Sequence, residues 1–318
     1  MGKTAKKWLI AAGVLVLLGT LMFVLTMCLA GWNFRKLSTE KFETKTYEPS
    51  EAFRDIKIEA DTADIVFLPA EDGKCRVVCY ERESVTYSVS AADGTLTVRA
   101  IDERNRYIGV AFENDRITVY LPKAEYAALV IEEKTGDVEI PHDFGFERID
   151  ISVSTGSVTC NASVAGDVRI TSSTGGIRVE NTSVASLDLS VSTGSVTVSD
   201  VTCGGNVRVG VTVGKTRLTN LTCKNVVSSG STGDISLECV IAEERFTIER
   251  STGDVSFRDC DASEIHTKTS TGNVEGNFLT EKVFVAESDT GHVDVPKTTT
   301  GGKCEIRTDT GHIRISVS

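Results

Sequence analysis

The sequence is poor in aromatic residues, in proline and in motifs that mark enzymes. Aromatic residues make up 6% of its 318 residues, and glycine outnumbers proline by 27 to 5. Valine, isoleucine, serine and threonine dominate instead, which favours strands over helices. The chain has no Gly-x-Ser-x-Gly elbow, no His-Glu-x-x-His helix and no Cys-x-x-Cys pair. These absences argue against a serine hydrolase, a zinc protease and a structural zinc site.

Basic residues are also scarce relative to acidic ones. The 34 lysines and arginines face 45 aspartates and glutamates, which gives a net charge of -11 and a pI near 5.0. A nucleic-acid-binding protein needs lysine and arginine to neutralise phosphates, so no nucleic-acid partner is expected. An acidic surface stays soluble near an anionic membrane, but it identifies no partner.

One stretch near the N-terminus lacks charge altogether. No charged residue lies between Trp8 and Trp32, and the run is long enough to cross a hydrocarbon core of about 30 Å as a helix. Lysines precede it, which favours a cytoplasmic N-terminal tail. We therefore expect a tail at 1–7, a transmembrane anchor at 8–32 that contacts membrane lipid, and a linker at 33–50. The protein would then be a single-pass cell-membrane protein with an extracytoplasmic C-terminal part.

A cleaved signal peptide is the alternative interpretation of this stretch. Cys28-Leu29-Ala30 before Gly31 is a weak cleavage site, and Leu25 to Cys28 only loosely resembles a lipoprotein box. Because the apolar run is long for a signal, we expect an uncleaved anchor.

An internal repeat dominates the rest of the chain. Successive corner glycines are 19 or 20 residues apart, nearly always after threonine, and occupy Gly136, Gly156, Gly175, Gly194, Gly214, Gly233, Gly253, Gly272, Gly291 and Gly311. Apolar residues recur seven and five positions before each glycine and two and four positions after it. This period-2 alternation on both sides of a tight turn predicts two half-buried strands per repeat. Glycine suits such a corner because it tolerates positive φ.

A second corner is expected after each short strand. Asparagine and aspartate recur there, and both suit a bend because their side chains bond their own backbone. They are followed three residues later by small apolar residues that we expect to point inward. The bend positions are Asn161, Asn181, Asp200, Asn220 and Asp259.

Stacked repeats bury what a single repeat cannot. The sequence therefore predicts an all-β fold, a parallel β-helix or β-solenoid, preceded by one transmembrane α-helix. Residues 135–318 form the regular coils. Residues 51–134 fit the same template less well, with Ala63, Gly94 and Asp115 in the glycine position and an extra strand at Cys75 to Tyr80. Counted together, these registers predict about 13–14 coils.

The ordered motifs resemble those of the bacterial putative-adhesin β-repeat family. The matching pieces are Ala63-Asp64-Ile65, Gly94 to Val98, Ile117 to Lys123 and the serial Ser-Thr-Gly-Asp motifs at Ser231 to Asp234 and Ser251 to Asp254. The resemblance implies a surface-exposed β-solenoid with no catalytic residues to carry over. Some relatives accompany envelope-stress regulators.

The chain has nine cysteines, an odd number that does not suit a framework of disulfides. Cys160 and Cys304 fall on inward positions, where free cysteine behaves as a small hydrophobe. Cys203 and Cys223 occupy the same place in successive coils, which leaves a disulfide between them open as the alternative.

Two polar pairs follow the corner glycines. Asp289-Thr290-Gly291-His292 repeats as Asp309-Thr310-Gly311-His312, which would stack two histidines beside two aspartates as a transition-metal site. Asp234 and Asp254 should also be stacked neighbours that repel unless a cation or water lies between them. A solvent-facing turn is the alternative for both pairs, and no other cofactor is expected.

Three function classes remain. The first is an adhesin-like surface interaction or scaffold protein whose partner is an envelope protein or a glycan. The second is an accessory or sensory component of envelope-stress signalling. A polysaccharide-active enzyme is the third, but it needs clustered carboxylates and clefts built from insertions between coils, which are nearly absent here. We therefore expect no enzyme.

The last strand carries one more hypothesis. The strand His312 to Val317 is expected to form the outermost, unpaired edge of the stack. Such an edge templates strand pairing, so self-association at the C-terminal coil is one outcome, and a short, solvated edge is the other.

Overall fold

A computed structural model describes residues 2–29, 31–33, 40–102 and 115–318. One helix precedes a set of strands that belong to a single hydrogen-bonded system. The helix, α1, spans Lys3–Leu29.

The described part of the chain has twenty-one strands after the helix. The strands in the first part of the chain are β1 (Phe42–Tyr47), β2 (Asp55–Ala60), β3 (Ala63–Pro69), β4 (Arg76–Arg82), β5 (Val85–Ala92), β6 (Thr95–Asp102), β7 (Asp115–Leu121), β8 (Glu125–Thr135), β9 (Val138–Ile140), β10 (Gly145–Thr155) and β11 (Val158–Cys160). Those in the second part are β12 (Ser163–Cys203), β13 (Asn206–Val213), β14 (Thr216–Thr232), β15 (Ile235–Thr252), β16 (Val255–Thr271), β17 (Val274–Phe278), β18 (Lys282–Thr290), β19 (Val293–Asp294), β20 (Gly302–Thr310) and β21 (Ile313–Val317).

The helix exposes most of its apolar side chains. An 18-residue window within Ala5–Leu29 has a mean hydropathy of 2.6 and is not buried against the rest of the chain, whereas Met27 near the end of the helix is buried. Its length and composition suffice to cross a membrane, and a helix satisfies all its backbone groups internally, as lipid requires.

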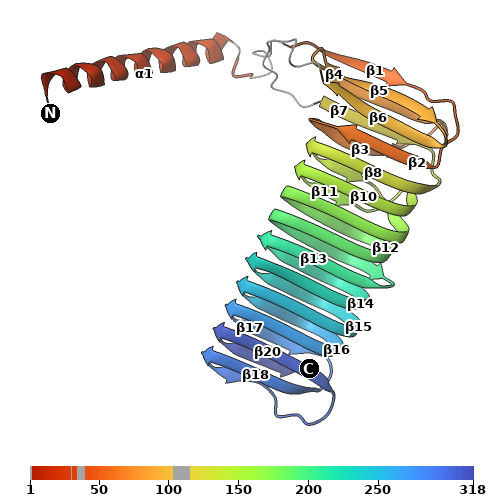
Figure 1. The fold of residues 1–318 in the computed structure, drawn as a ribbon, viewed down its shortest axis with the longest axis vertical. Coiled ribbons are helices and arrows are strands. Elements are labelled where there is room, and N and C mark those ends of the chain that lie inside the picture. Colours follow the sequence, from red (N-terminus) through yellow and green to blue (C-terminus); the bar gives the residue numbers. More distant parts are fainter. Residues whose placement is uncertain (1, 30, 34–39, 103–114) are drawn as a thin grey trace.

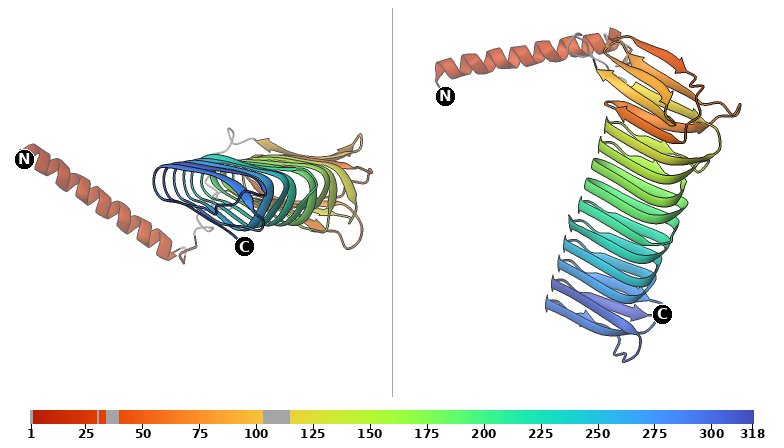
Figure 2. Two further views of the ribbon diagram at one scale, coloured as in Figure 1. Left: turned by 90° about the horizontal axis from the view of Figure 1, so that it is seen from below. Right: turned by 45° about the vertical axis from the view of Figure 1, so that its right-hand side comes forward.

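The strands from β8 onward form the predicted β-solenoid of about 10 turns. Each strand pairs in parallel with its copy one repeat away, so Thr216 lies beside Ile235 and Ile235 beside Val255. Seen from below, the turns overlie one another as nested flat ovals (Figure 2). Figure 1 shows the resulting elongated stack.

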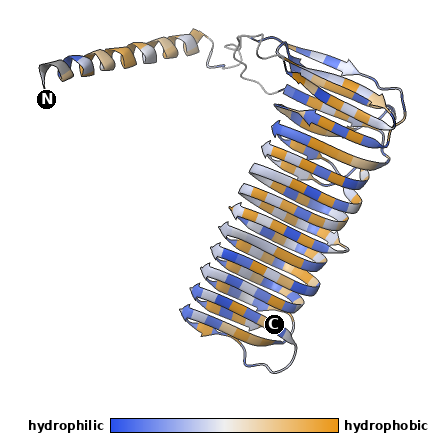
Figure 3. Cartoon of the chain, viewed as in Figure 1, coloured by the Kyte–Doolittle hydropathy of each residue, from blue (hydrophilic) through white to orange (hydrophobic). Residues whose placement is uncertain are grey.

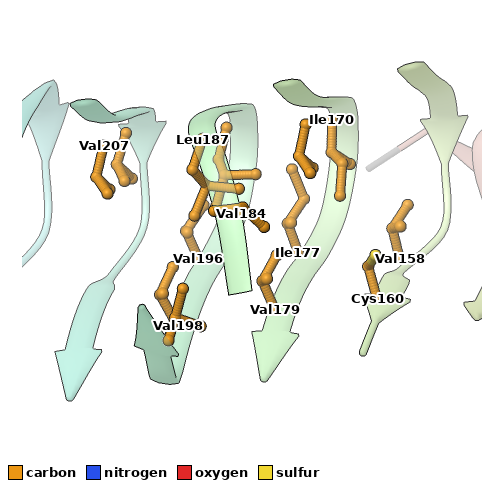
Figure 4. Packing of buried hydrophobic residues seen from close by; sticks show 14 of the residues in the cluster. Val158, Cys160, Ile170, Ile177, Val179, Val184, Leu187, Val196, Val198 and Val207 are labelled. Carbon is orange, nitrogen blue, oxygen red and sulfur yellow. The ribbon is translucent and has the colours of Figure 1, made fainter. Parts of the chain in front are cut away.

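The core is a set of inward-facing columns. Buried and exposed residues alternate along each strand, which Figure 3 shows as alternating bands of hydropathy. Figure 4 shows how valine, leucine and isoleucine side chains of successive coils meet between the two faces. The small residues predicted to point inward after the second corner are all buried, at 2–5% exposure: Val164, Val184, Cys203, Cys223, Ala242 and Ala262.

The two predicted corners are confirmed in the regular coils. Gly194 and Gly253 have φ angles of 149° and 145°, as the glycine repeat requires. At the second corner, Asn181, Asp200, Asn220 and Asp259 have φ angles of 49–55°. Cys239 adopts the same conformation, with φ 53°, at a position that the sequence pattern did not single out. Asn161 is not among the positive-φ residues, so its bend differs.

The coil count of 13–14 was too high because the N-terminal part is not a simple continuation of the stack. The predicted coil around Gly94 is instead the antiparallel hairpin β5–β6. Its turn residues Asp93 and Gly94 have φ angles of 51° and 76°, as a type I′ turn requires. The predicted extra strand exists as β4, but it pairs antiparallel with β1 and β7.

Parts of the N-terminal template are nevertheless correct. Ala63 occupies the glycine position, because β3 pairs in parallel with β9 and with β7, where Ala63 lies beside Asp115. Ile56, Ile58, Ala60, Ile65 and Phe67 are buried as expected. Ile108, Val110 and Phe112, also expected to face inward, lie outside the described residues.

The order of the last coils differs from the order in the sequence. Strand β20 pairs with β16 on one side and with β18 on the other, and β21 lies between β17 and β19. The strand His312 to Val317 is therefore internal, and the prediction that it forms the outermost edge was wrong. The 19–20-residue period fixes which residues align but not the spatial order of equivalent coils. The outermost coil is β18–β19 (Figure 1).

Candidate interaction surfaces

The glycine corners are built by backbone contact between coils. Corner glycines within the stack donate their N–H to the threonine carbonyl of the next coil, as Gly233 does to Thr252 at 2.8 Å and Gly253 to Thr271 at 2.8 Å. A Cβ on Gly253 would lie 2.2 Å from the carbonyl oxygen of Gly233. These corners therefore stack as a close-packed backbone column along one side of the solenoid.

The residue after each glycine forms a second column, here called the corner ladder. Its side chains accept a hydrogen bond from the backbone N–H of the equivalent residue one coil further along. Asp137 accepts from Ser157 at 2.7 Å, and Asp254 accepts from Asn273 at 2.7 Å. The ladder explains why polar residues suit this position, because most of them satisfy a backbone donor of the next coil. The acceptors are Asp137, Ser157, Asp234, Asp254, Asn273 and His312.

The aspartate pair that was expected to repel unless a cation or water lies between its members belongs to this ladder. Asp234 accepts the backbone N–H of Asp254 at 3.3 Å, and the ammonium of Lys215 lies 3.5 Å from the other Asp234 oxygen. Backbone donors and a lysine thus relieve the repulsion between the two carboxylates. A bound cation is not needed to explain their proximity.

The histidine pair lies at the far end of the same ladder. Asn273 accepts the backbone N–H of His312 at 2.8 Å, and Nδ1 of His312 accepts the backbone N–H of His292 at 3.0 Å. The two histidines are thus adjacent as predicted, with Asp289 and Asp309 aligned on the exposed side two residues before the glycines. Within the described ranges, no group of three or more histidine, cysteine, aspartate or glutamate side chains is placed to hold a metal. The metal site stays a prediction.

Charged side chains cover the outward faces and pair across coils. Arg258 contacts Glu238 at 3.0 Å, and Arg314 lies 3.8 Å from Glu275. These residues line a shallow groove over the short strands near the C-terminal end, together with Asn277 and Ser318. The exposed carboxylate of Asp294 also lines the groove, which is therefore a polar surface in which two of the carboxylates, Glu238 and Glu275, are held by arginine.

A buried polar cluster occupies the N-terminal part of the solenoid. The Arg82 guanidinium donates to both carboxylate oxygens of Asp115 at 3.1 Å and to the hydroxyl of Thr62 at 2.6 Å. Asp115 is fully buried, and burial raises the pKa of its carboxyl despite the neighbouring arginine. Lys45 pairs with the buried Glu81 on the other side of β4.

Glu133 is the least satisfied member of this cluster. It is 3% exposed, and its Oε1 accepts the backbone N–H of Thr135 at 3.0 Å and that of Ala63 at 3.4 Å. Its Oε2 has no hydrogen-bond partner among the described residues, and neither does the nearby Tyr87 hydroxyl. Burial raises the pKa of the Glu133 carboxyl to about 7. The sequence held one signal for this residue, namely a carboxylate at an inward position of the repeat.

Arg250 is a second buried charge that sequence reasoning missed. It is 3% exposed, and its guanidinium donates to the carbonyl oxygen of Val211 at 2.7 Å, two coils away. Gly230, in the intervening coil, makes this reach possible, because a Cβ there would lie 1.9 Å from Nη1 of Arg250. Burial lowers the pKa of Arg250.

All nine cysteines are free thiols. Cys160 and Cys304 are buried at 1% and 0% exposure, as predicted for inward positions. Cys203 and Cys223 are neighbouring buried thiols, and the alternative disulfide between them is absent. Cys239 is the exposed thiol of the solenoid's regular coils.

The chain belongs to the Toastrack family, DUF4097. The family model matches residues 53–210 and 204–318, which together span nearly everything after the linker. The predicted resemblance to the putative-adhesin β-repeat family is confirmed by this match. No protein of established annotation matches the sequence.

Several solved structures are similar to this chain at low sequence identity. A putative adhesin from Parabacteroides merdae is 14% identical, with 87% of this chain and 96% of that chain covered and a TM-score of 0.46. A putative adhesin from Bacteroides fragilis is 17% identical, with 87% and 97% covered and a TM-score of 0.38. A putative cell adhesion protein from Clostridium sporogenes is 12% identical, with 88% and 100% covered and a TM-score of 0.24. These likenesses assign no ligand and no role to the chain.

Proposed function

We propose that the protein is a membrane-anchored, extracytoplasmic scaffold that offers an adhesin-like interaction surface and has no catalytic activity. The observation that carries the proposal is the exposed apolar helix Ala5–Leu29, which precedes a rigid, polar solenoid. Lysines before the helix favour a cytoplasmic N-terminus. The solenoid would then stand outside the membrane, where an envelope protein or a glycan can reach its flanks.

The charge arrangement on the solenoid supports a non-enzymatic role. The pairs Arg258–Glu238 and Arg245–Glu264, with closest approaches of 3.0 Å and 2.5 Å, join adjacent coils and tie up outward charges. A polysaccharide-active site needs a free acid–base carboxylate pair at a defined separation. Outward carboxylates that are held by arginine across coils suit a stable, extended contact surface better.

The anchor is tested by fractionation. We expect the full chain to remain in the membrane pellet after carbonate washing, with an intact N-terminus by mass spectrometry. A mature chain that begins at Gly31 or Cys28 would instead identify a signal peptide or a lipoprotein.

The adhesive role is tested by competition. Cells that carry the full chain should bind to their target surface or envelope fraction more than deletion cells do, and added soluble residues 40–318 should compete. A matched control replaces the solenoid by an unrelated exported domain behind residues 1–50. Binding that depends on the anchor alone, or that is unchanged by deletion, would contradict an adhesive solenoid.

An accessory role in envelope-stress sensing is the second candidate. The observation that favours it is Glu133, a buried carboxyl whose pKa of about 7 makes its charge sensitive to pH near neutrality. It lies in the part of the solenoid that follows the anchor in sequence. An envelope-stress reporter should respond differently to external pH in cells with the Glu133→Gln chain if this role is real. An identical response in both strains would exclude it.

A further inference from the structure

The outermost coil of the solenoid differs from every coil behind it. This end coil comprises β18, β19 and the corner between them, residues 282–294. Strand β18 pairs only with β20, and β19 pairs only with β21. No described strand pairs with the opposite edge of either one, although the loop at 295–301 lies beside the start of β18, where the hydroxyl of Thr298 donates to the carbonyl oxygen of Lys282.

The backbone of the end coil leaves unbonded a donor that is bonded in the internal coils. Along the stack, the N–H of Gly272 donates to Thr310 at 2.9 Å and the N–H of Gly311 donates to Thr290 at 3.1 Å. The equivalent donor, the N–H of Gly291, has no acceptor among the described residues. The corner ladder also ends here, since His292 donates to His312 but receives no N–H itself.

The core is open at the same end. In the adjacent coil, the inward residues Cys304, Ile306 and Ile313 are fully buried. In the end coil, their equivalents Phe284, Ala286 and Val293 are only partly buried against the core. Exposed apolar surface next to an unpaired strand edge favours association with a further strand.

The geometry limits what can cover this end. An occupant must present two strands separated by one tight corner, with apolar residues spaced two apart on both strands, so that both edges and both inward columns are covered together. An isolated peptide strand covers only one face. The end coil of a second copy has the required strand lengths and sheet separation, and an antiparallel arrangement lets two identical ends meet about a two-fold axis.

The opposite end of the solenoid does not offer the same surface. There the outer strands are β1 and β5, which run antiparallel to their neighbours. A parallel head-to-tail stack that repeats the internal register is therefore not available at that end.

We propose that the end coil is a self-association surface, at which two copies of the chain pair tail to tail through β18. One coil presents roughly 30 Å by 10 Å, or about 300 Å² per copy. This is well below the roughly 800 Å² per partner of a stable interface, so the dissociation constant should be on the order of 0.1 mM or weaker. Many anchored copies would strengthen the contact through multivalency.

The charges at the end coil predict how self-association depends on salt. Glu281, Glu287, Asp289 and Asp294 are exposed around it and outnumber the basic groups there, the exposed Lys297 and Arg307, which lies 4.0 Å from Glu287. Two such ends therefore carry net charge of the same sign and repel. Salt screens such repulsion, so self-association should strengthen as ionic strength rises. Docking of a partner with a basic strand would show the opposite salt dependence.

The full chain in detergent micelles is studied by sedimentation equilibrium. Its concentration is varied from about 5 µM to 0.5 mM, the range that a weak interface of this size requires. The variant is Val285→Glu, because Val285 is 45% exposed on the outer side of β18 and can change without disturbing the core. The control is Ile241→Glu, since Ile241 is 37% exposed on an internal coil. Circular dichroism checks that both variants remain folded.

The parent and the control should show a concentration-dependent dimer that salt strengthens, and Val285→Glu should weaken it at least tenfold. A parent that stays monomeric over the whole range overturns the proposal. So does a dimer that Val285→Glu leaves intact, which would point to the membrane helix. A dimer that salt dissociates also overturns it. None of these outcomes depends on whether the chain is an adhesin.

Discussion

The glycine corner offers a sharp test of how the coils stack. Replacing Gly253 by alanine places a methyl group 2.2 Å from the carbonyl oxygen of Gly233 and 2.6 Å from its carbon, at a φ of 145°. Ordinary carbon contacts need about 3.5 Å, so the two corners would have to separate by roughly 1 Å. That separation stretches the 2.8 Å bond from the Gly233 N–H to Thr252.

The expected cost follows from these two effects. A non-glycine residue held in this φ region costs about 1–3 kcal/mol, and a lost buried hydrogen bond adds about 1 kcal/mol. We therefore expect Gly253→Ala to lower the free energy of unfolding by about 3 kcal/mol. Gly194→Ala should behave alike, because its added Cβ would lie 1.7 Å from the Gly175 carbonyl oxygen.

The assay is urea denaturation followed by circular dichroism. Gly204→Ala is the matched control, since an added Cβ there meets nothing within 4 Å and its φ is not in the strained range. The control should match or slightly exceed the parent, because alanine reduces the entropy of the unfolded chain. If Gly253→Ala unfolds within about 0.5 kcal/mol of the parent, the close-packed corner column is incorrect.

The remaining predictions concern buried charges and the histidine pair. Because the pKa of Glu133 is raised from 4.5 to about 7 in the folded state, its contribution to stability is present at pH 4.5 and is lost as the pH rises through 7. Because glutamine does not ionise, the Glu133→Gln variant should avoid up to about 3 kcal/mol of this loss of stability at high pH. In urea titrations it should be more stable than the parent at pH 8.5 and similar to it at pH 5; equal pH profiles would contradict this. Gly230→Ala should displace the Arg250 guanidinium and destabilise the chain by about 2 kcal/mol or more, whereas the double variant with Arg250→Ala should recover part of the loss in a double-mutant cycle; strict additivity would refute the contact. In calorimetric titrations, zinc should bind to the parent more tightly than to the His292→Ala or His312→Ala variant. The absence of binding heat for the parent at millimolar zinc would refute the metal site.

The repeat in the sequence was sufficient to predict the fold because one period carries both signals that a solenoid needs. Glycine marked the tight corner, and alternating apolar residues such as Val255 and Phe257 marked the inward face. The same reasoning overcounted coils around Gly94, since a β-hairpin also alternates apolar and polar residues about a glycine turn. Antiparallel and parallel strands share this period, so pattern alone does not distinguish them.

The sequence pattern did not predict the spatial order of the last coils, for a related reason. Thr271, Thr290 and Thr310 occupy equivalent positions, and each can pair with either of the others. The buried charges were missed because their partners come from distant coils. Arg250 reaches the backbone of Val211, and Asp115 meets Arg82 from β4. The one signal in the sequence was shared by Glu133 and Arg250, which both stand at the inward position three residues before a corner glycine.

The most direct test of surface display uses Cys239, which is exposed on the solenoid while the other cysteines of the regular coils are buried. Because Cys28 is exposed and Cys75 is half-buried, both are first replaced by serine in the parent chain. Intact cells that express this parent are treated with a membrane-impermeant maleimide, and Cys239→Asn in the same background serves as the control because asparagine also tolerates a φ of 53°. The account predicts that the parent is labelled in intact cells and that the control is not. A parent that is labelled only after the membrane is permeabilised would place the solenoid on the cytoplasmic side and contradict the account.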